Sequence, residues 1–371
     1  MPKEIPSCKR FSGYKPCFTD HNCWEDGCKD NIPVGTKILI INLDAMGDVL
    51  MTTAQLPALK KKFPESTIYW VTLKNAAPLL FNNPLVDHVY NFDAESILIL
   101  QQMKFDLVMN VDKSQQSCAL LNSLDSKNKL GFGLNPDGKI IPVNEGANYN
   151  YQLGLDDHFK FKINQRTGQD YLAETFDLDY KRDEYVFELI DEEIKFVNNY
   201  KKKVGIKKRD KVLGFNTGCS ELYPNKKMTI DQHVYLIKRL LKKKYKIVLL
   251  GGPEDTQRNK EIYSHFKGKI INTPTNEGLR RGICYENIPD IVVTGDSLGM
   301  HIAIALRKFV IAWFGVSCWT EIDLYDRGVK LFQEDLFCSP CWKRQCPYNL
   351  ECIELIDLDR IIEEVDNYFK K

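Results

Sequence analysis

The first stretch able to do chemistry is the loop from Asp44 to Asp48, which directly follows a buried apolar run. Gly47 permits a close backbone turn there, and Asp48 falls in the first turn of the helix that follows. A carboxylate in this position complements the helix dipole. It can equally act as a general base that takes a proton from an incoming hydroxyl group. The loop alone leaves both roles open.

A second loop offers hydrogen-bond donors to a phosphate group. It reads Asn216-Thr217-Gly218-Cys219-Ser220, and Lys226 follows a few residues later. Small hydroxyl residues around a glycine expose backbone N–H groups, and the lysine supplies a counter-charge. The lysine spacing differs from that of a P-loop. An ordinary β-turn with a surface lysine is the alternative.

A third loop lies within residues 290–315, where an apolar strand pattern stops at Thr294 and a helix pattern begins. Asp296 and Ser297 stand at the start of this helix, whose uncapped N–H groups attract anions. His301, about one turn farther on, either reaches the same site or is a hydrogen-bonded core histidine. The carboxyl ends of parallel strands are where open α/β sheets bind ligands.

Two series of alternating strands and helices position these loops. Strand patterns are expected at 37–43, 67–73, 86–92, 105–111 and 129–133, and again at 211–216, 246–252, 269–273, 290–295 and 308–315. Such alternation predicts an α/β protein with two parallel sheets, each covered by helices on both faces. We expect a cysteine-rich extension at 1–33, Rossmann-like domains at 34–200 and 201–352, and a closing helix at 353–371.

The motifs resemble those of glycosyltransferase family 9, which holds the ADP-heptose:lipopolysaccharide heptosyltransferases. The resemblance is carried by the G-D-V-L-x-T-T pattern between Leu43 and Leu59, by N-T-G with a downstream lysine, and by T-G-D-S-x-x-M-H followed by W-F-G. It spans residues 35–365. It implies the GT-B fold, in which two Rossmann-like domains face each other and the last helix returns to the first domain.

The resemblance also implies a role for individual residues. Asp48 matches the base that deprotonates the acceptor hydroxyl for an inverting attack on the donor sugar, and Lys226 matches the lysine that stabilises the departing diphosphate. The positions that match donor-binding residues are Gly47, Thr217, Gly218, Ser220, Glu254, Asp296, Ser297, Gly299 and His301. No cofactor is required for the transfer itself.

Twelve cysteines are unusual in a chain of this composition. Cys338, Cys341, Cys346 and Cys352 form C-x2-C-x4-C-x5-C, a spacing that suits a structural zinc or iron. Cys8, Cys17, Cys23 and Cys28 form a second, wider set. Disulfides or plain buried thiols are the alternatives. By resemblance, the cysteine-bound iron of some autotransporter heptosyltransferases keeps iron among the candidate metals.

Composition restricts the location and the partners. A net charge of +1 gives no argument for nucleic acid, and the polar start lacks the apolar core of a signal peptide. We therefore expect a cytoplasmic protein. Its lysine clusters leave a peripheral contact with the inner face of a membrane open. The sequence also leaves oligomer formation open.

The combined prediction is an inverting glycosyltransferase that moves a sugar, with heptose favoured, from a nucleotide-diphosphate donor, with ADP-heptose favoured. The acceptor hydroxyl belongs to a lipopolysaccharide core, a related glycolipid or a protein, as in the autotransporter-type protein heptosyltransferases. The alternative is a non-catalytic nucleotide-sugar-binding or assembly module. The presence of Asp48, Lys226 and His301 favours the enzyme, because a binding module has no need of a base.

Overall fold

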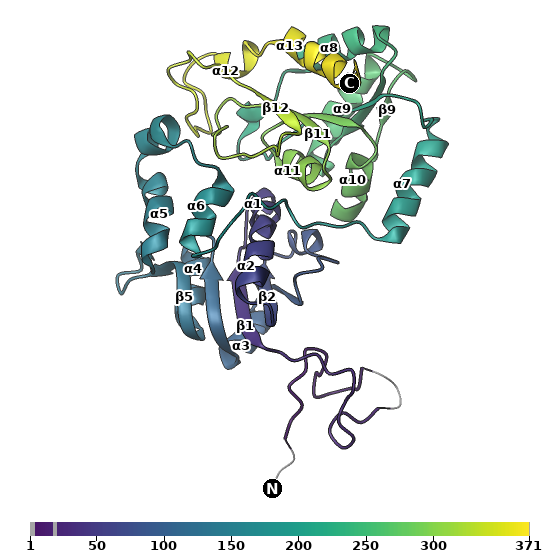
Figure 1. The fold of residues 1–371 in the computed structure, drawn as a ribbon. Coiled ribbons are helices and arrows are strands. Elements are labelled where there is room, and N and C mark those ends of the chain that lie inside the picture. Colours follow the sequence, from purple (N-terminus) through teal and green to yellow (C-terminus); the bar gives the residue numbers. More distant parts are fainter. Residues whose placement is uncertain (1–3, 18–20, 371) are drawn as a thin grey trace. The chain divides into compact units, whose positions relative to one another are not determined.

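The computed structural model describes residues 4–17 and 21–370, which divide into two compact units. The first comprises residues 1–44, 55–151 and 172–183, and the second comprises 45–54, 152–171 and 184–371, less the residues that the structure does not describe. Each unit contains one six-stranded sheet (Figure 1). The predicted α/β fold with two Rossmann-like sheets is confirmed.

The first unit is built on a sheet of strand order β3-β2-β1-β4-β5-β6. Its strands are β1 (Thr36–Ile41), β2 (Ser66–Thr72), β3 (His88–Asn91), β4 (Lys104–Asn110), β5 (Asp125–Leu134) and β6 (Ile140–Pro142). All neighbours are parallel except β6, which pairs antiparallel with β5. The helices of this part of the chain are α2 (Leu56–Lys62), α3 (Ala94–Gln102), α4 (Gln115–Ser123), α5 (Asn148–Leu155) and α6 (Gly168–Thr175). The last two straddle the division between the units.

The second unit repeats this winding with an entirely parallel sheet of order β12-β11-β10-β7-β8-β9. Its strands are β7 (Val212–Asn216), β8 (Lys246–Leu250), β9 (Ile271–Asn272), β10 (Ile291–Gly295), β11 (Phe309–Trp313) and β12 (Gly328–Leu331). Its longer helices are α1 (Met46–Thr52), α7 (Asp191–Lys203), α8 (Ile230–Lys242), α9 (Thr256–Ser264), α10 (Leu279–Glu286), α11 (Leu298–Ala305) and α13 (Leu358–Lys370), and α12 (Glu351–Glu354) is a single turn. The edge strand β12 was not among the predicted strands.

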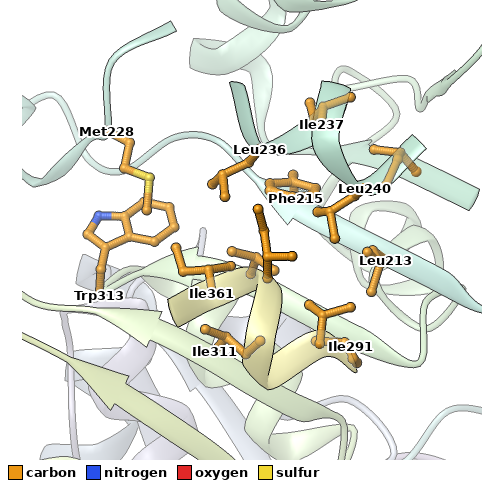
Figure 2. Close-up of a cluster of buried hydrophobic side chains, with 14 of the residues drawn as sticks. Leu213, Phe215, Met228, Leu236, Ile237, Leu240, Ile291, Ile311, Trp313 and Ile361 are labelled. Carbon is orange, nitrogen blue, oxygen red and sulfur yellow. The ribbon is translucent and has the colours of Figure 1, made fainter. Parts of the chain in front are cut away.

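Alternation along the strands separates two layers of core in this unit. Side chains of odd-numbered positions, among them Leu213, Phe215 and Ile291, point to the cluster beneath α8, where Leu236 and Leu240 meet them (Figure 2). Ile361 of α13 fills the same cluster. The opposite face of the sheet is covered by α10 and α11.

Two further elements belong to the second unit by their contacts. The closing segment is split into α12 and α13, and α13 packs on α8, because its apolar face completes the α8 cluster. Helix α7, expected in the first domain, also lies in the second unit, since Glu193 pairs with Arg280 and Tyr200 stacks edge-on against Tyr285.

The described part of the extension ahead of β1 forms neither helix nor strand. It is attached through Lys9, whose backbone N–H donates to Ile32 O at 2.8 Å and whose ammonium lies 2.9 Å from Asp87 Oδ1. Within residues 4–17 and 21–370, none of the helices has the length and apolar character needed to cross a membrane.

Candidate active site

Asp48 is fixed at the start of α1. Its backbone N–H donates to Ala45 O at 2.9 Å, and one of its carboxylate oxygens accepts from Ala45 N–H at 3.3 Å. The first bond fixes the backbone of Asp48, and the second ties its side chain to the residue that precedes the helix. The carboxylate is therefore held at the N-terminal end of α1. The expected position in the first helical turn is therefore observed.

The surroundings of Asp48 raise its pKa to about 6. Removal from water is the main cause, and the nearby carboxylates of Asp296 and Glu321 add to it, while Ala45 N–H and Lys160 act in the opposite direction. A carboxylate with this pKa is ionised near neutral pH and is a stronger proton acceptor than an ordinary aspartate. This is the electrostatic character required of a general base.

Helix α1 packs directly on α11, and Gly47 makes this contact possible. A Cβ atom on Gly47 would lie only 2.5 Å from Cδ2 of His301. The His301 ring is buried, and its Nδ1 lies 3.0 Å from the hydroxyl of Tyr185. Burial lowers the pKa of His301 to about 4, so the ring is neutral at pH 7. His301 is thus both a core residue and a neighbour of Asp48.

Lys226 and Asp296 form a close, nearly buried ion pair. The ammonium donates to Asp296 Oδ2 at 2.7 Å, and the two side chains are 12% and 13% exposed. Burial alone would raise the pKa of Asp296, but the Lys226 ammonium holds it below its usual value. The backbone of Lys226 is fixed as well, because Trp313 Nε1 donates to its carbonyl at 2.9 Å. A cation is therefore held at the carboxyl end of β10.

The loop after β7 is shaped by a residue that was not predicted, Asp255. A Cβ atom on Gly218 would lie 1.6 Å from Asp255 Oδ1, so only glycine fits. The Thr217 hydroxyl is directed away into the core, where it donates to Asn259 Oδ1 at 2.5 Å. Ser220 and the predicted nucleoside residue Glu254 are both exposed. Ser220 uses its hydroxyl to accept from Leu222 N–H at 3.2 Å.

The start of α11 is tied to the end of β7 through Asn216. Its side-chain N–H donates to Ser297 Oγ at 2.8 Å and to Thr294 Oγ1 at 3.0 Å. Gly299 lies so close that an added Cβ would be 2.2 Å from Asn216 Nδ2. Ser297 and Gly299 therefore have a demonstrable packing role, and the second and third predicted loops are joined in one site.

The structure adds charged residues that the motifs did not reveal. Lys160 lies in the single π-helical turn Phe159–Ile163, and its Nζ is 3.5 Å from Glu321 Oε1. Tyr171 donates to the same oxygen at 3.4 Å. Both Lys160 and Glu321 act on the pKa of Asp48. They come from irregular segments with no periodicity, so the sequence held no signal for them.

All twelve cysteines are free thiols. Cys338, Cys341, Cys346 and Cys352 line one small cavity together with Asn225 and Val316. Burial raises the pKa of Cys352 to about 12, and the other three thiols add to this effect. The four thiols of the predicted C-terminal set thus line the same cavity, but no three of their sulfur atoms lie within 4.8 Å of one another.

The N-terminal extension contains a tighter group that includes a histidine. Among the described residues, His21, Cys23 and Cys28 are the only three His, Cys, Asp or Glu residues whose possible ligand atoms all lie within 4.8 Å of one another. Cys17 lies beside them, since it acts on the pKa of Cys23. His21 Nε2 is buried and has no hydrogen-bond partner in the described part of the chain. This Cys/His group could bind a metal ion, with His21 as the ligand that the cysteine pattern missed.

This chain is similar to known proteins both in sequence and in fold. The family model "Glycosyltransferase family 9 (heptosyltransferase)" matches residues 98–351. A lipopolysaccharide heptosyltransferase 1 from Campylobacter coli is 25% identical over 302 residues, which cover 76% of this chain and 84% of that protein.

Two solved structures share the fold at 18% identity, and each comparison covers 90% of this chain. A glycosyl transferase family 9 protein from Veillonella parvula has a TM-score of 0.70 over 96% of its chain. The ADP-heptose lps heptosyltransferase II of E. coli has a TM-score of 0.65 over 98% of its chain. With the family model matching most of its length, this chain belongs to glycosyltransferase family 9, the heptosyltransferase family, and is a glycosyltransferase.

Proposed function

We propose that this enzyme transfers heptose from ADP-heptose to a hydroxyl group of a lipopolysaccharide-core acceptor, with inversion at the anomeric carbon. The names of the relatives support the donor and the acceptor, since one is a lipopolysaccharide heptosyltransferase 1 and another an ADP-heptose lps heptosyltransferase II. The observation that carries the reaction type is the raised pKa of Asp48 next to the Lys226–Asp296 pair. A base and a cation for the leaving group thus occupy one unit of the chain.

In the proposed reaction, Asp48 takes the proton of the acceptor hydroxyl as its oxygen attacks the anomeric carbon. A new carbon–oxygen bond forms while the bond between that carbon and the β-phosphate oxygen breaks, and the electron pair leaves with ADP. Lys226 stabilises the negative charge that grows on the diphosphate. Backbone N–H groups of the Gly218 loop and of the first turn of α11 bind its phosphates. The hydroxyl of Thr217 is not assigned to a phosphate, because it already donates to Asn259 in the core.

Glu254 is proposed to contact the nucleoside, since it is exposed in the loop after β8, at the same sheet end as the Gly218 loop. We assign Ser220, Ser297 and His301 to contacts with the diphosphate and the sugar of the donor. In this assignment Gly47 allows α1 to approach α11, and Gly299 allows α11 to approach Asn216. The remaining donor-binding residues keep the roles that the family motif gives them.

Transfer activity of Asp48→Asn tests the mechanism. Asp44→Asn is the matched control, because Asp44 is an exposed carboxylate in the same loop. We expect Asp48→Asn to lose at least about a hundredfold in kcat and Asp44→Asn to stay near wild type. Equal activity of wild type and Asp48→Asn would overturn the assignment. A lipopolysaccharide-core acceptor and a protein acceptor are assayed in parallel, and transfer to the protein alone would instead favour the autotransporter-type activity.

We also propose that the His21, Cys23 and Cys28 group, with Cys17 as fourth ligand, binds a structural zinc or iron ion. The unpartnered His21 nitrogen and the thiols around it fit a tetrahedral site of one nitrogen and three sulfurs. A metal there would fix an extension that has no regular structure of its own. The C-terminal thiols share a cavity and are proposed as a second site, which would close on the metal when it binds.

A further inference from the structure

Trp342 lies close to two lysines of the candidate active site. The Nζ atom of Lys226 is 4.5 Å from the centroid of the indole ring, and the Nζ atom of Lys160 is 5.3 Å from it. Lys226 is the cation already assigned to the leaving group, whereas neither Lys160 nor Trp342 belongs to a recognised motif. Two ammonium groups therefore contact the same aromatic side chain.

The backbone around Trp342 is firmly held. Its N–H donates to Val316 O at 2.8 Å, and Cys341 N–H donates to the same oxygen at 3.0 Å. The ring packs edge-on against Tyr223, with centroids 5.2 Å apart. Trp342 adopts a positive φ of 50°, a conformation that costs energy for a residue of this size. The indole is thus kept in place by the segment that carries the C-terminal cysteines.

The indole N–H is a buried donor that lacks an acceptor. Nε1 of Trp342 makes no hydrogen bond within the described residues, although it is inaccessible to water. A buried donor without a partner is unfavourable, because it has lost its hydrogen bonds to water without replacing them. An anionic ligand that reaches this point would supply the missing acceptor, and its charge would be met by the two lysines near the ring.

Lys160 is the more loosely paired of the two lysines. Its Nζ lies 3.5 Å from Glu321, whereas Lys226 lies 2.7 Å from Asp296. Lys160 is also twice as exposed as Lys226, at 24% against 12%. A weak ion pair on a long side chain can be exchanged for a phosphate at little cost. Lys160 is therefore able to turn from Glu321 to a ligand.

We propose that Lys160 and the indole N–H of Trp342 form a second phosphate-binding position beside Lys226, so that two lysines hold the diphosphate of the donor. This inference rests on the proposed function, because it assigns the same leaving group. It adds a residue from the segment 159–163 to a site that the motifs place entirely on strand ends. An acidic group of the acceptor is the other anion that Lys160 could meet, and the experiment separates the two.

Binding of ADP and AMP by calorimetry provides the test, since the two nucleotides differ by one phosphate. Wild type is compared with Lys160→Met, with Trp342→Phe, which keeps a ring but loses the N–H, and with the control Lys208→Met at an exposed lysine. We expect Lys160→Met to weaken ADP binding about tenfold and AMP binding less than twofold. Trp342→Phe should weaken ADP binding several-fold, and Lys208→Met should change neither.

The outcomes are distinguishable. If wild type binds neither nucleotide, the proposed donor class fails. If wild type prefers ADP and Lys160→Met binds it equally well, the second phosphate position is overturned. Unchanged ADP binding together with a raised KM for the acceptor would place Lys160 on the acceptor instead. Melting temperatures of all variants verify folding, and Lys160→Met decides the matter even if Trp342→Phe proves unstable.

Discussion

The hydroxyl of Tyr185 lies 3.0 Å from Nδ1 of His301, and the two rings stack with an interplanar angle of 14°. Burial keeps His301 neutral, so its Nδ1 either accepts from the Tyr185 hydroxyl or donates to it, and in both cases the contact orients the ring. Tyr185 is thus a positioning residue for a histidine that lies against the helix of the proposed base.

Removal of this hydroxyl should affect turnover more than folding. We expect Tyr185→Phe to lower kcat by about three- to tenfold and to leave KM for the donor within twofold. The stacking is retained, so the melting temperature should fall by only a few degrees. Steady-state kinetics and thermal melts check this. Full activity in Tyr185→Phe would show that turnover does not depend on this contact.

The raised pKa of Asp48 predicts the pH dependence of both activity and stability. The value of kcat/KM should rise with pH through an apparent pKa near 6, as Asp48 becomes ionised. Since the folded pKa lies above the ordinary 3.8, the protonated carboxyl stabilises the fold, and this contribution is lost as pH rises through about 6.

Asp48→Asn should therefore be more stable than wild type at pH 8, by about 1 to 3 kcal/mol, and equal to it near pH 4. Chemical denaturation at the two pH values measures the difference. A variant that is less stable than wild type at pH 8 would contradict the electrostatic account.

The Lys226–Asp296 pair predicts a non-additive pair of substitutions. Lys226→Met leaves a buried carboxylate without its cation and should destabilise the protein by about 3 to 5 kcal/mol. Lys226→Met combined with Asp296→Asn should recover most of this loss, while transfer activity stays absent. Urea unfolding of the two single variants and the double variant gives the coupling energy. Additive losses would mean that the pair contributes little.

Gly47 and Gly282 form a matched test of close packing. Gly47→Ala places a Cβ 2.5 Å from His301, and we expect a loss of about 1 to 3 kcal/mol together with a strong loss of activity. Gly282 is in α10, where an added Cβ meets nothing within 4 Å. Gly282→Ala should therefore stabilise the helix by about 0.5 to 1 kcal/mol. Equal tolerance of both substitutions would argue against the contact of α1 with α11.

The metal proposal is tested by elemental analysis of protein purified without chelator. Cys23→Ser should lower the metal content by about one ion per chain, because it removes a ligand of the N-terminal group. Cys8→Ser is the control, since Cys8 lies in the same extension but outside that group. Cys341→Ser tests the C-terminal site in the same way. Metal-free wild type with unmodified thiols would exclude both sites.

The central strands β2, β7 and β10 could be predicted because each is a continuous buried run bounded by turn residues. The edge strands β6 and β12 were missed, since their residues are only partly buried. Asp48, Lys226 and Asp296 could be proposed from the sequence because they stand at strand ends with a motif around them. Lys160, Glu321 and Trp342 could not be found, since they lie in irregular segments and meet the site only through long-range folding.

The packing of α1 on α11 brings the proposed base to the second unit from a segment that is far from residues 184–371 in the sequence. A polypeptide that began at Glu184 would retain Lys226, Asp296 and His301, which we assign to the leaving group and the donor, but it would contain neither Asp48 nor Lys160. Such a fragment would be a receptor for nucleotides without the means to activate an alcohol. Recovery of the complete site would require both the stretch 45–54, which carries Asp48, and the stretch 152–171, which carries Lys160.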